Sequence, residues 1–319
     1  MDRKPLIILT GPTAVGKTEL SVRLAQKLGG EIISADSMQV YRKMNIGTAK
    51  VTPDQMQGIR HHLIDVFDPS EDFNVFRFQE LAKKALQEIY AAGHIPIIAG
   101  GTGFYIQAVL YDIDFTDTDT DTSYRSELYE LAEKKGASYV HGLLKEADPE
   151  AAQSIHPNNI KRVVRALEYF HQTGQKISRH NKEQAQKQSP YNFIYFVLND
   201  DRKLIYERID RRVDMMIEAG LLEEVKALMD EGYDKSLTSM KGLGYKEIMD
   251  YYNGERTLDE AVFILKRDTR HFAKRQLTWF GREKDVTWVN LNDFEGGYPE
   301  KKDMALSFML EKAKEKGII

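Results

Sequence analysis

The sequence contains no cysteine and no long hydrophobic run. Without cysteine, neither a disulfide framework nor a zinc site with thiolate ligands can form, which is typical of a protein in a reducing compartment. The apolar run from Leu6 to Leu9 is shorter than the roughly 7 to 15 residues of a signal-peptide core. No stretch approaches the roughly 20 apolar residues that span a bilayer. We therefore expect a cytoplasmic protein without a membrane segment.

The chain also has no excess of positive charge. It contains 45 Lys and Arg residues and 49 Asp and Glu residues, which gives a formal net charge of -4. Such a chain does not coat nucleic acid through its overall field, so any RNA contact must come from local patches. With 319 residues and 42% hydrophobic composition, the chain can form one large core with an appended unit, or two domains. Nothing in it demands an oligomer, and we expect a monomer.

The first third of the chain alternates short apolar runs with helical patterns. Strands are expected at residues 5–10, 31–35 and 95–99. Between the first two, leucines recur every four residues at Leu20, Leu24 and Leu28, which predicts a helix. This alternation predicts an α/β fold, with a parallel sheet covered by helices on both faces and a ligand site beyond the carboxyl ends of the strands.

The composition changes at residues 112–122, where Asp and Thr alternate. Helical patterns follow at 124–135 and 160–172, and a β-like run at 192–198 returns the chain to the sheet. We therefore predict a core of residues 1–115 and 191–319, interrupted by a mainly helical insertion domain at residues 116–190. The remainder is expected to be helical, including a long helix that Thr257 and Glu260 begin as a capping box and Gly281 ends.

Residues 11–18 have the pattern of a phosphate-binding loop, or P-loop. They are Gly11, Pro12, Thr13, Ala14, Val15, Gly16, Lys17 and Thr18. In this pattern backbone N–H groups cradle phosphates, the lysine adds a charge, and the Thr18 hydroxyl binds Mg²⁺. The following helix presents its positive end to the same anion. The pattern predicts a P-loop core with Mg²⁺ as cofactor, but it does not separate ATP or GTP from a simple diphosphate.

Asp36 is the acid best placed to act beside this loop, because it ends the second expected strand at the same edge as Lys17 and Thr18. It could ligate magnesium, cap the following turn, or act as a general base, a role worth about 100- to 10,000-fold in rate. The sequence leaves these three roles open. Asp200, at the end of another apolar run, is either a second metal acid or part of a solvated turn after a core strand.

Several further blocks follow the P-loop in a distinctive order. They lie at residues 36–41 (DSMQVY), 45–50 (NIGTAK), 61–65 (HHLID), 100–102 (GGT), 155–158 (IHPN, with Arg162 and Arg165), 242–245 (GLGY) and 273–280 (AKRQLTWF). In content and order they resemble the tRNA dimethylallyltransferases, also called isopentenyl-tRNA transferases. The likeness covers nearly the whole chain, and the blocks at 36–41 and 273–280 are far more specific than the P-loop alone.

The resemblance implies a reaction. A dimethylallyl group passes from dimethylallyl diphosphate to the exocyclic amino nitrogen of the adenosine immediately 3′ of the anticodon, and diphosphate leaves. It implies that Lys17 and Arg212 stabilise the departing diphosphate, that Thr18 ligates Mg²⁺, and that Asp36 accepts the proton from the amino nitrogen. Arg208 and Arg211, close to Arg212, are expected to be surface charges.

The resemblance also implies how the tRNA anticodon stem-loop is bound. The reacting adenine must leave its stack, and Ser37, Met38 and Gln39 match the segment that surrounds it; Gln39 has a donor and an acceptor for a base edge. Thr102 and Arg125 match positions that contact tRNA, although Arg125 could equally be a solvated helix charge. Together with Asp36, these residues form the expected tRNA site of the core and its flank.

A local basic patch supports RNA binding in the insertion. Residues 161–187 hold seven basic residues against two acidic ones, and Lys161, Arg162 and Arg165 are predicted to contact tRNA phosphates, which gives affinity rather than sequence reading. A second basic set recurs at helical spacing near the C-terminus and forms either another wall of the RNA site or an ordinary solvated face. Its members are Arg267, Arg270 and Lys274.

Two other functions remain possible from the residues. A small-molecule kinase would use the arginines of residues 208–212 as a lid over ATP, but it would not need the basic insertion. A non-catalytic RNA-binding protein with a relic loop would not need both Lys17 and Asp36.

Overall fold

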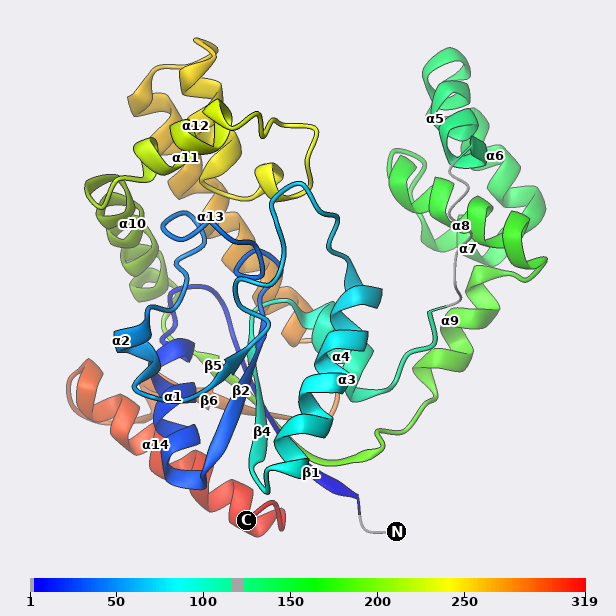
Figure 1. Cartoon of the computed structure of the whole chain (residues 1–319). Helices are drawn as coiled ribbons and strands as arrows, with labels where there is room; N and C mark the ends of the chain where they lie inside the picture. Colours follow the sequence, from blue (N-terminus) through cyan, green and yellow to red (C-terminus); the bar gives the residue numbers. More distant parts are fainter. Residues whose placement is uncertain (1–2, 116–122) are drawn as a thin grey trace. The chain divides into compact units, whose positions relative to one another are not determined.

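The computed structural model describes residues 3–115 and 123–319, and the chain divides into two compact units (Figure 1). The first consists of the chain up to residue 110 and from residue 190 on, and the second of residues 111–189. The domain boundary expected at residue 116 lies outside the described residues. No helix of the two described ranges is long and apolar enough to cross a membrane.

The first unit is built on a six-stranded sheet in which every pair of neighbours is parallel, in the order β3-β2-β4-β1-β5-β6. The strands are β1 (Lys4–Thr10), β2 (Gly30–Ala35), β3 (His61–His62), β4 (Ile95–Gly100), β5 (Tyr191–Asn199) and β6 (Val286–Asn290). The parallel α/β sheet is thus confirmed. The expectation that the chain after β5 is wholly helical is wrong, because the short edge strand β6 pairs with β5.

Helices of the first unit cover both faces of this sheet. They are α1 (Lys17–Leu28), α2 (Pro53–Met56), α3 (Val75–Ala91), α4 (Gly103–Leu110), α10 (Arg202–Glu218), α11 (Leu221–Asp230), η1 (Ser239–Lys241), α12 (Tyr245–Tyr252), α13 (Leu258–Phe280), η2 (Leu291–Asp293) and α14 (Tyr298–Glu315). As expected, α13 begins with a capping box, in which the Thr257 hydroxyl accepts the Glu260 N–H and the Glu260 carboxylate accepts the Thr257 N–H.

Alternation along the strands sends side chains to two separate layers. Ile7 and Leu9 of β1 and Phe196 of β5 pack with Leu20 of α1 and Met309 of α14 in one buried cluster. On the other face, α3 contacts β2 and β4 and packs against α4, which in turn meets α13 (Figure 1). Because both faces are covered, the strands are nearly continuous apolar runs, as parallel strands usually are.

The carboxyl ends of the central strands meet at one edge of the sheet. Thr10 of β1 lies opposite Gly100 of β4, which lies opposite Ala35 of β2. The Thr10 hydroxyl donates to the Gly100 carbonyl across 2.7 Å, and the Thr102 N–H donates to the Ala35 carbonyl. The P-loop, Asp36 and the turn after β4 therefore emerge side by side, where open α/β sheets bind ligands.

The second unit is helical and has a small core of its own. It consists of α5 (Ser123–Lys135), α6 (Ala137–Ala147), α7 (Pro149–Ser154), α8 (Ile160–Thr173) and α9 (Ile177–Ala185). Leu128, Val140, Leu144, Val163 and Leu167 are its central buried residues. Asp148, fully buried, ties its parts together by accepting hydrogen bonds from the Ala151 N–H and from the N–H and hydroxyl of Ser178.

The opposite edge of the sheet holds a buried carboxylate, Glu31. Its oxygens lie 2.7 Å from His62 Nε2 and 2.6 Å from His94 Nδ1. Burial opposes ionisation, but the hydrogen bonds to His62 and His94 outweigh it, so the pKa of Glu31 lies below its ordinary value. A carboxylate with a lowered pKa stabilises the fold above its unfolded pKa and loses that contribution as the pH falls through the folded pKa.

We therefore expect Glu31→Gln to lower the free energy of unfolding at neutral pH by about 1–3 kcal/mol. The difference from wild type should shrink as the pH falls through the lowered folded pKa of Glu31, below which the carboxyl is protonated in both states. Thermal unfolding across this pH range measures it. Glu88→Gln, which alters an exposed partner of Arg60, serves as the control and should change little. A difference that persisted at acid pH would contradict the assignment to the Glu31 charge.

Candidate active site

The P-loop leaves β1 with three residues in the left-handed region of the backbone. The φ angles are 144° at Gly11, 63° at Ala14 and 101° at Gly16. A Cβ at Gly11 would lie only 2.4 Å from the Leu198 carbonyl oxygen, so the loop passes tightly against β5. The N–H groups of Ala14, Val15 and Gly16 donate to no acceptor in the described part of the chain. With the positive end of α1 beside them, they form a site for an anion.

Lys17 lies within this site. Its Nζ donates to the carbonyls of Gly11 and Pro12 across 3.0 and 2.8 Å. Burial and the nearby Arg212 guanidinium lower the pKa of Lys17 to about 7, while the Asp36 carboxylate acts in the opposite direction. Burial also lowers the pKa of Arg212. A lysine and an arginine close together in a buried site favour a bound anion, and Lys17 lies near enough to Arg212 and Asp36 for both to act on its pKa.

Asp36 uses one carboxylate oxygen to cap the turn that follows β2. Its Oδ1 accepts the N–H groups of Met38 and Gln39 across 2.9 and 3.3 Å. The capping role is therefore real, and it occupies only Oδ1: among the described residues, Oδ2 accepts no hydrogen bond. The carboxylate lies close enough to Lys17 to act on the pKa of that lysine.

The segment after Asp36 is half-buried, and its side chains are partly engaged. Gln39 Nε2 donates to the carbonyls of Thr48 and Ala49, so the donor that was expected to read a base edge holds a loop instead, and Oε1 is left to accept. Met38 packs against Gly242, where an added Cβ would lie 2.6 Å from Met38 Cε. Ser37, which precedes Met38, is also half-buried.

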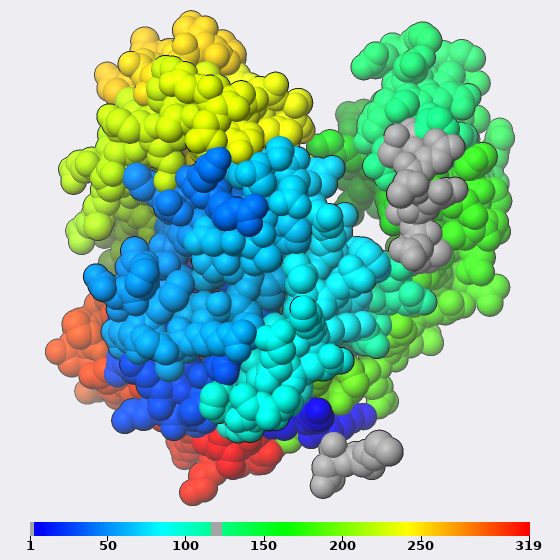
Figure 2. All heavy atoms as spheres, in the orientation of Figure 1, coloured from blue at the N-terminus to red at the C-terminus, as the bar shows by residue number. Residues whose placement is uncertain are grey.

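Glu224 of α11 anchors the loop that Gln39 holds. Its two carboxylate oxygens accept the N–H groups of Asn45, Ile46 and Gly47 and the hydroxyl of Tyr245. Gly47 must be glycine here, because a Cβ would lie 2.6 Å from the Tyr245 ring. This loop and the α11–α12 region accordingly lie against each other on the surface (Figure 2). Sequence reasoning did not find Glu224.

Gln276 joins two parts of the site that are far apart in the sequence. Its Oε1 accepts the Thr13 N–H across 2.9 Å, and its Nε2 donates to the Gly101 carbonyl across 3.0 Å. The side chain is buried, and a Cβ on Gly101 would lie 2.2 Å from Nε2. Gln276 therefore fixes the P-loop to the turn that carries Thr102, itself half-buried. The sequence placed Gln276 in a family block but indicated no role for it.

Of the arginines on α10, one does not behave as expected. Arg211 is exposed, as predicted. Arg208 was expected to be a surface charge, and this is wrong: its guanidinium donates to the Ala14 carbonyl across 3.1 Å and pairs with Asp200 across 2.6 Å. It lies one turn from Arg212, so both face the P-loop. Asp200 is buried in this pair, which engages the acid that was considered for a metal.

The residues around Thr18 fit a magnesium ion that is held largely by phosphate and water. Thr18 lies at the exposed start of α1, and its hydroxyl makes no hydrogen bond within the described ranges. No group of three or more His, Cys, Asp or Glu among the described residues could hold a metal by itself. Magnesium commonly keeps several waters and takes one or two protein ligands plus substrate phosphates, which is compatible with this set.

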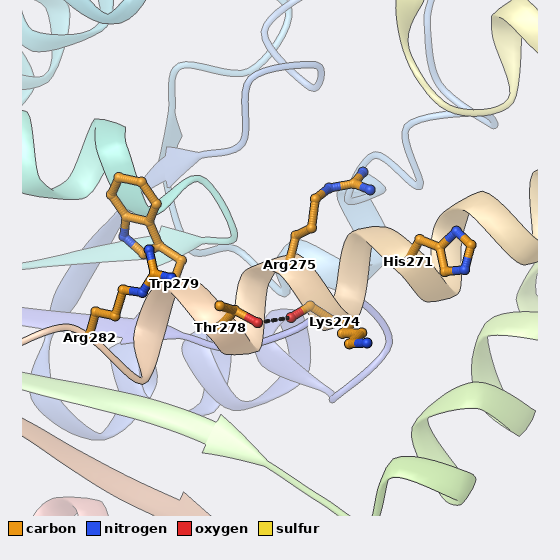
Figure 3. A pocket seen from close by; sticks show the side chains of 6 residues that line it. All are labelled: His271, Lys274, Arg275, Thr278, Trp279 and Arg282. Carbon is orange, nitrogen blue, oxygen red and sulfur yellow. Dashed lines mark hydrogen bonds between the residues drawn. The ribbon is translucent and has the colours of Figure 1, made fainter. Parts of the chain in front are cut away.

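A hollow of about 400 Å³ runs along one side of α13. Side chains from successive turns of the helix line it (Figure 3). They are His271, Lys274, Arg275, Thr278, Trp279 and Arg282. Trp279 meets the partly exposed Phe104 edge to face, with 6.3 Å between the ring centroids. The hollow thus combines cations with the indole ring of Trp279, a combination suited to unstacked bases and phosphates.

Only one member of the basic set predicted on this helix reaches the hollow. Lys274 lines it, whereas Arg267 pairs with Asp268 and Arg270 pairs with Asp210 of α10. Those two arginines therefore lie in ion pairs with acidic neighbours and do not line the hollow.

The residues predicted to bind tRNA in the second unit fall into two groups. Lys161 and Arg162, at the start of α8, are exposed. Arg125 instead makes a bidentate ion pair with the buried carboxylate of Glu168, with both N–O distances at 2.9 Å. Arg165 lies 3.3 Å from the same carboxylate. Arg125 is therefore not a free helix charge but holds α5 against α8.

The parallel sheet, the loop at its carboxyl edge and the facing cations define a P-loop α/β protein with an anion site. Residues 39–283 match the sequence pattern of the IPP transferase family. A tRNA dimethylallyltransferase of Lachnoclostridium phytofermentans is 62% identical over 291 residues, 91% of this chain and 93% of that protein. The chain belongs to the tRNA dimethylallyltransferase family of prenyl-transferring enzymes.

Solved structures agree with this assignment. A tRNA isopentenylpyrophosphate transferase from Bacillus halodurans is 45% identical, with a TM-score of 0.74 over 99% of this chain and 98% of that one. A eukaryotic dimethylallyltransferase acting on tRNA is 31% identical, with a TM-score of 0.79 over 90% of this chain and 74% of that one. The predicted family and fold class are thereby confirmed.

Proposed function

We propose that this enzyme transfers the dimethylallyl group of dimethylallyl diphosphate to the exocyclic amino nitrogen of the adenosine immediately 3′ of the anticodon in tRNA. The observation that carries the proposal is the grouping of Lys17, Arg212 and Asp36 at the carboxyl edge of the sheet, beside the N–H groups of Ala14, Val15 and Gly16, which have no acceptor among the described residues. This grouping offers cations to a diphosphate and a carboxylate to an incoming amine.

The reaction breaks the bond between the allylic carbon and the diphosphate oxygen and forms a bond from that carbon to the amino nitrogen. Negative charge grows on the departing diphosphate, where Lys17, Arg212 and the P-loop N–H groups stabilise it. The nitrogen loses one proton, which Oδ2 of Asp36 accepts, because Oδ1 is committed to the turn. A bound Mg²⁺, held by Thr18 and the phosphates, would add further charge neutralisation.

The acceptor is proposed to be the anticodon stem-loop with its adenosine extruded from the stack. Ser37, Met38 and Gln39 directly follow Asp36, so an adenine next to Asp36 would contact them. On the neighbouring turn, the Thr102 N–H donates to the carbonyl of Ala35, the residue before Asp36. The hollow on α13 supplies cations and Trp279 for flanking nucleotides. Lys161 and Arg162 are proposed to contact backbone phosphates, and Arg125 and Arg165 to do so only with the face that Glu168 leaves open.

The purified protein is expected to add one dimethylallyl group to an anticodon stem-loop RNA in the presence of dimethylallyl diphosphate and Mg²⁺, without any nucleoside triphosphate. Mass spectrometry of the RNA measures the gain. The control is the same stem-loop with guanosine in place of the reacting adenosine, which should keep its mass. An unmodified adenosine RNA, together with turnover of ATP, would favour a P-loop kinase instead.

A monomer is proposed as the working unit. Its RNA substrate is consistent with action in the cytoplasm. Size-exclusion chromatography with light scattering, at the concentration of the activity assay, tests the first point directly.

A further inference from the structure

Two carbonyl groups of the P-loop accept hydrogen bonds from side chains of distant segments. Arg208 Nε of α10 donates to the Ala14 carbonyl across 3.1 Å, and the Tyr298 hydroxyl of α14 donates to the Val15 carbonyl across 3.2 Å. Ala14 and Val15 are buried. Tyr298 lies beyond residues 39–283, where the family match ends.

A peptide group is planar and trans, so its C=O and the following N–H point in opposite directions. The described residues contain no cis peptide bond. When the Ala14 carbonyl is drawn outward to Arg208, the Val15 N–H must point inward. Because the Val15 carbonyl points toward Tyr298, the Gly16 N–H must point in the opposite direction. These are the N–H groups that lack an acceptor within the described chain.

The two side chains are themselves fixed. Arg208 pairs with the buried Asp200 and stacks on the Tyr298 ring, its guanidinium carbon 4.7 Å from the ring centroid. The Lys302 ammonium lies 4.5 Å from the same centroid and pairs with Glu19 of α1. The hydroxyl of Tyr298 also stands 2.7 Å from where a Cβ of Gly16 would be. The ring is thus enclosed by cations and by the loop itself.

We propose that Arg208 and Tyr298 form an outer clamp on the P-loop and act as positioning residues, which turn the Val15 and Gly16 N–H groups toward the diphosphate. The clamp deepens the proposed function and rests on it, because it acts on the diphosphate through the loop. The proposal requires no contact between either side chain and the substrate. The left-handed backbone of Ala14, with φ of 63°, is a conformation that such outside hydrogen bonds help to maintain.

The test is Tyr298→Phe, which removes one hydrogen bond and keeps the ring under Arg208 and Lys302. We expect the Kd for Mg²⁺–pyrophosphate and the KM for dimethylallyl diphosphate to rise about 3- to 10-fold, the effect of one hydrogen bond. The KM for the stem-loop RNA should not change. Arg208→Lys, which keeps the charge but loses the Nε donor to Ala14, should shift the same two constants.

The matched control is Leu306→Val, which loosens the buried face of α14 without altering the P-loop contacts. It should lower Tm and leave pyrophosphate binding unchanged. Equal Kd values for wild type and Tyr298→Phe would overturn the clamp, as would a weakening by Leu306→Val that matched Tyr298→Phe at the same loss of Tm. Failure of the wild type to bind pyrophosphate would instead overturn the proposed function, and the clamp with it.

Discussion

Asp36→Asn is expected to lower the single-turnover rate of prenyl transfer at least about 100-fold, while stem-loop RNA still binds. The substitution is informative because of how the carboxylate is used. Asparagine Oδ1 can still accept the N–H groups of Met38 and Gln39, so the turn is kept. The amide that replaces Oδ2 cannot take a proton from the amino nitrogen. The loss therefore reports proton transfer rather than a collapsed turn.

Asp36→Ala provides the comparison, since it removes both the turn cap and the base. Its rate should be at least as low as that of Asp36→Asn, and its RNA affinity should fall further because residues 37–39 lose their support. Rapid-quench measurement of modified RNA, with RNA binding followed by fluorescence anisotropy, separates the two effects. A single-turnover rate of Asp36→Asn near that of wild type would remove Asp36 from the base role.

Lys17→Met is expected to lower kcat by about 100- to 1,000-fold, the usual cost of removing one preorganised group that stabilises a developing anion.

The pH dependence of diphosphate binding provides a second test of Lys17. In the free enzyme, burial and Arg212 lower the pKa of Lys17 to about 7. A bound diphosphate favours the ammonium and raises that pKa. Above about pH 7, binding must therefore take up a proton at Lys17, and the affinity for diphosphate should fall as the pH rises.

Calorimetry of pyrophosphate binding near pH 8, in two buffers with different ionisation enthalpies, measures this uptake. The ligand also exchanges protons, so the relevant quantity is the difference between wild type and Lys17→Met, which share the same ligand. Wild type should take up more protons than the variant, by up to about one per site. Equal uptake by the two proteins would show that Lys17 is already charged before the anion arrives.

Local patterns in the sequence were sufficient for the main features of the core. The strand at residues 5–10 and the P-loop are consecutive, and the capping box at Thr257 and Glu260 spans one turn, so each is visible in a short window. Asp36 was found because parallel strands end at a common edge. β6 was missed because it is a five-residue edge strand, half of whose neighbours are absent.

Contacts between distant segments could not be predicted in this way. Gln276 meets Thr13 across 263 positions, and Glu224 meets Ile46 across 178; no local pattern records either pairing. Arg208 was recoverable in part, because it lies four residues before Arg212 and so on the same helix face. The sequence could not predict that α10 packs so that Arg208 reaches the Ala14 carbonyl.

The order of the strands has a consequence for synthesis of the chain on the ribosome. β1, which leads into the P-loop, is made well before β5, one of its two partners, which begins at Tyr191, and Tyr298 comes later still. A nascent chain that has exposed only its first half cannot hold the loop in its finished shape. Competence to bind a diphosphate is therefore acquired only after both β5 and α14 have emerged from the exit tunnel.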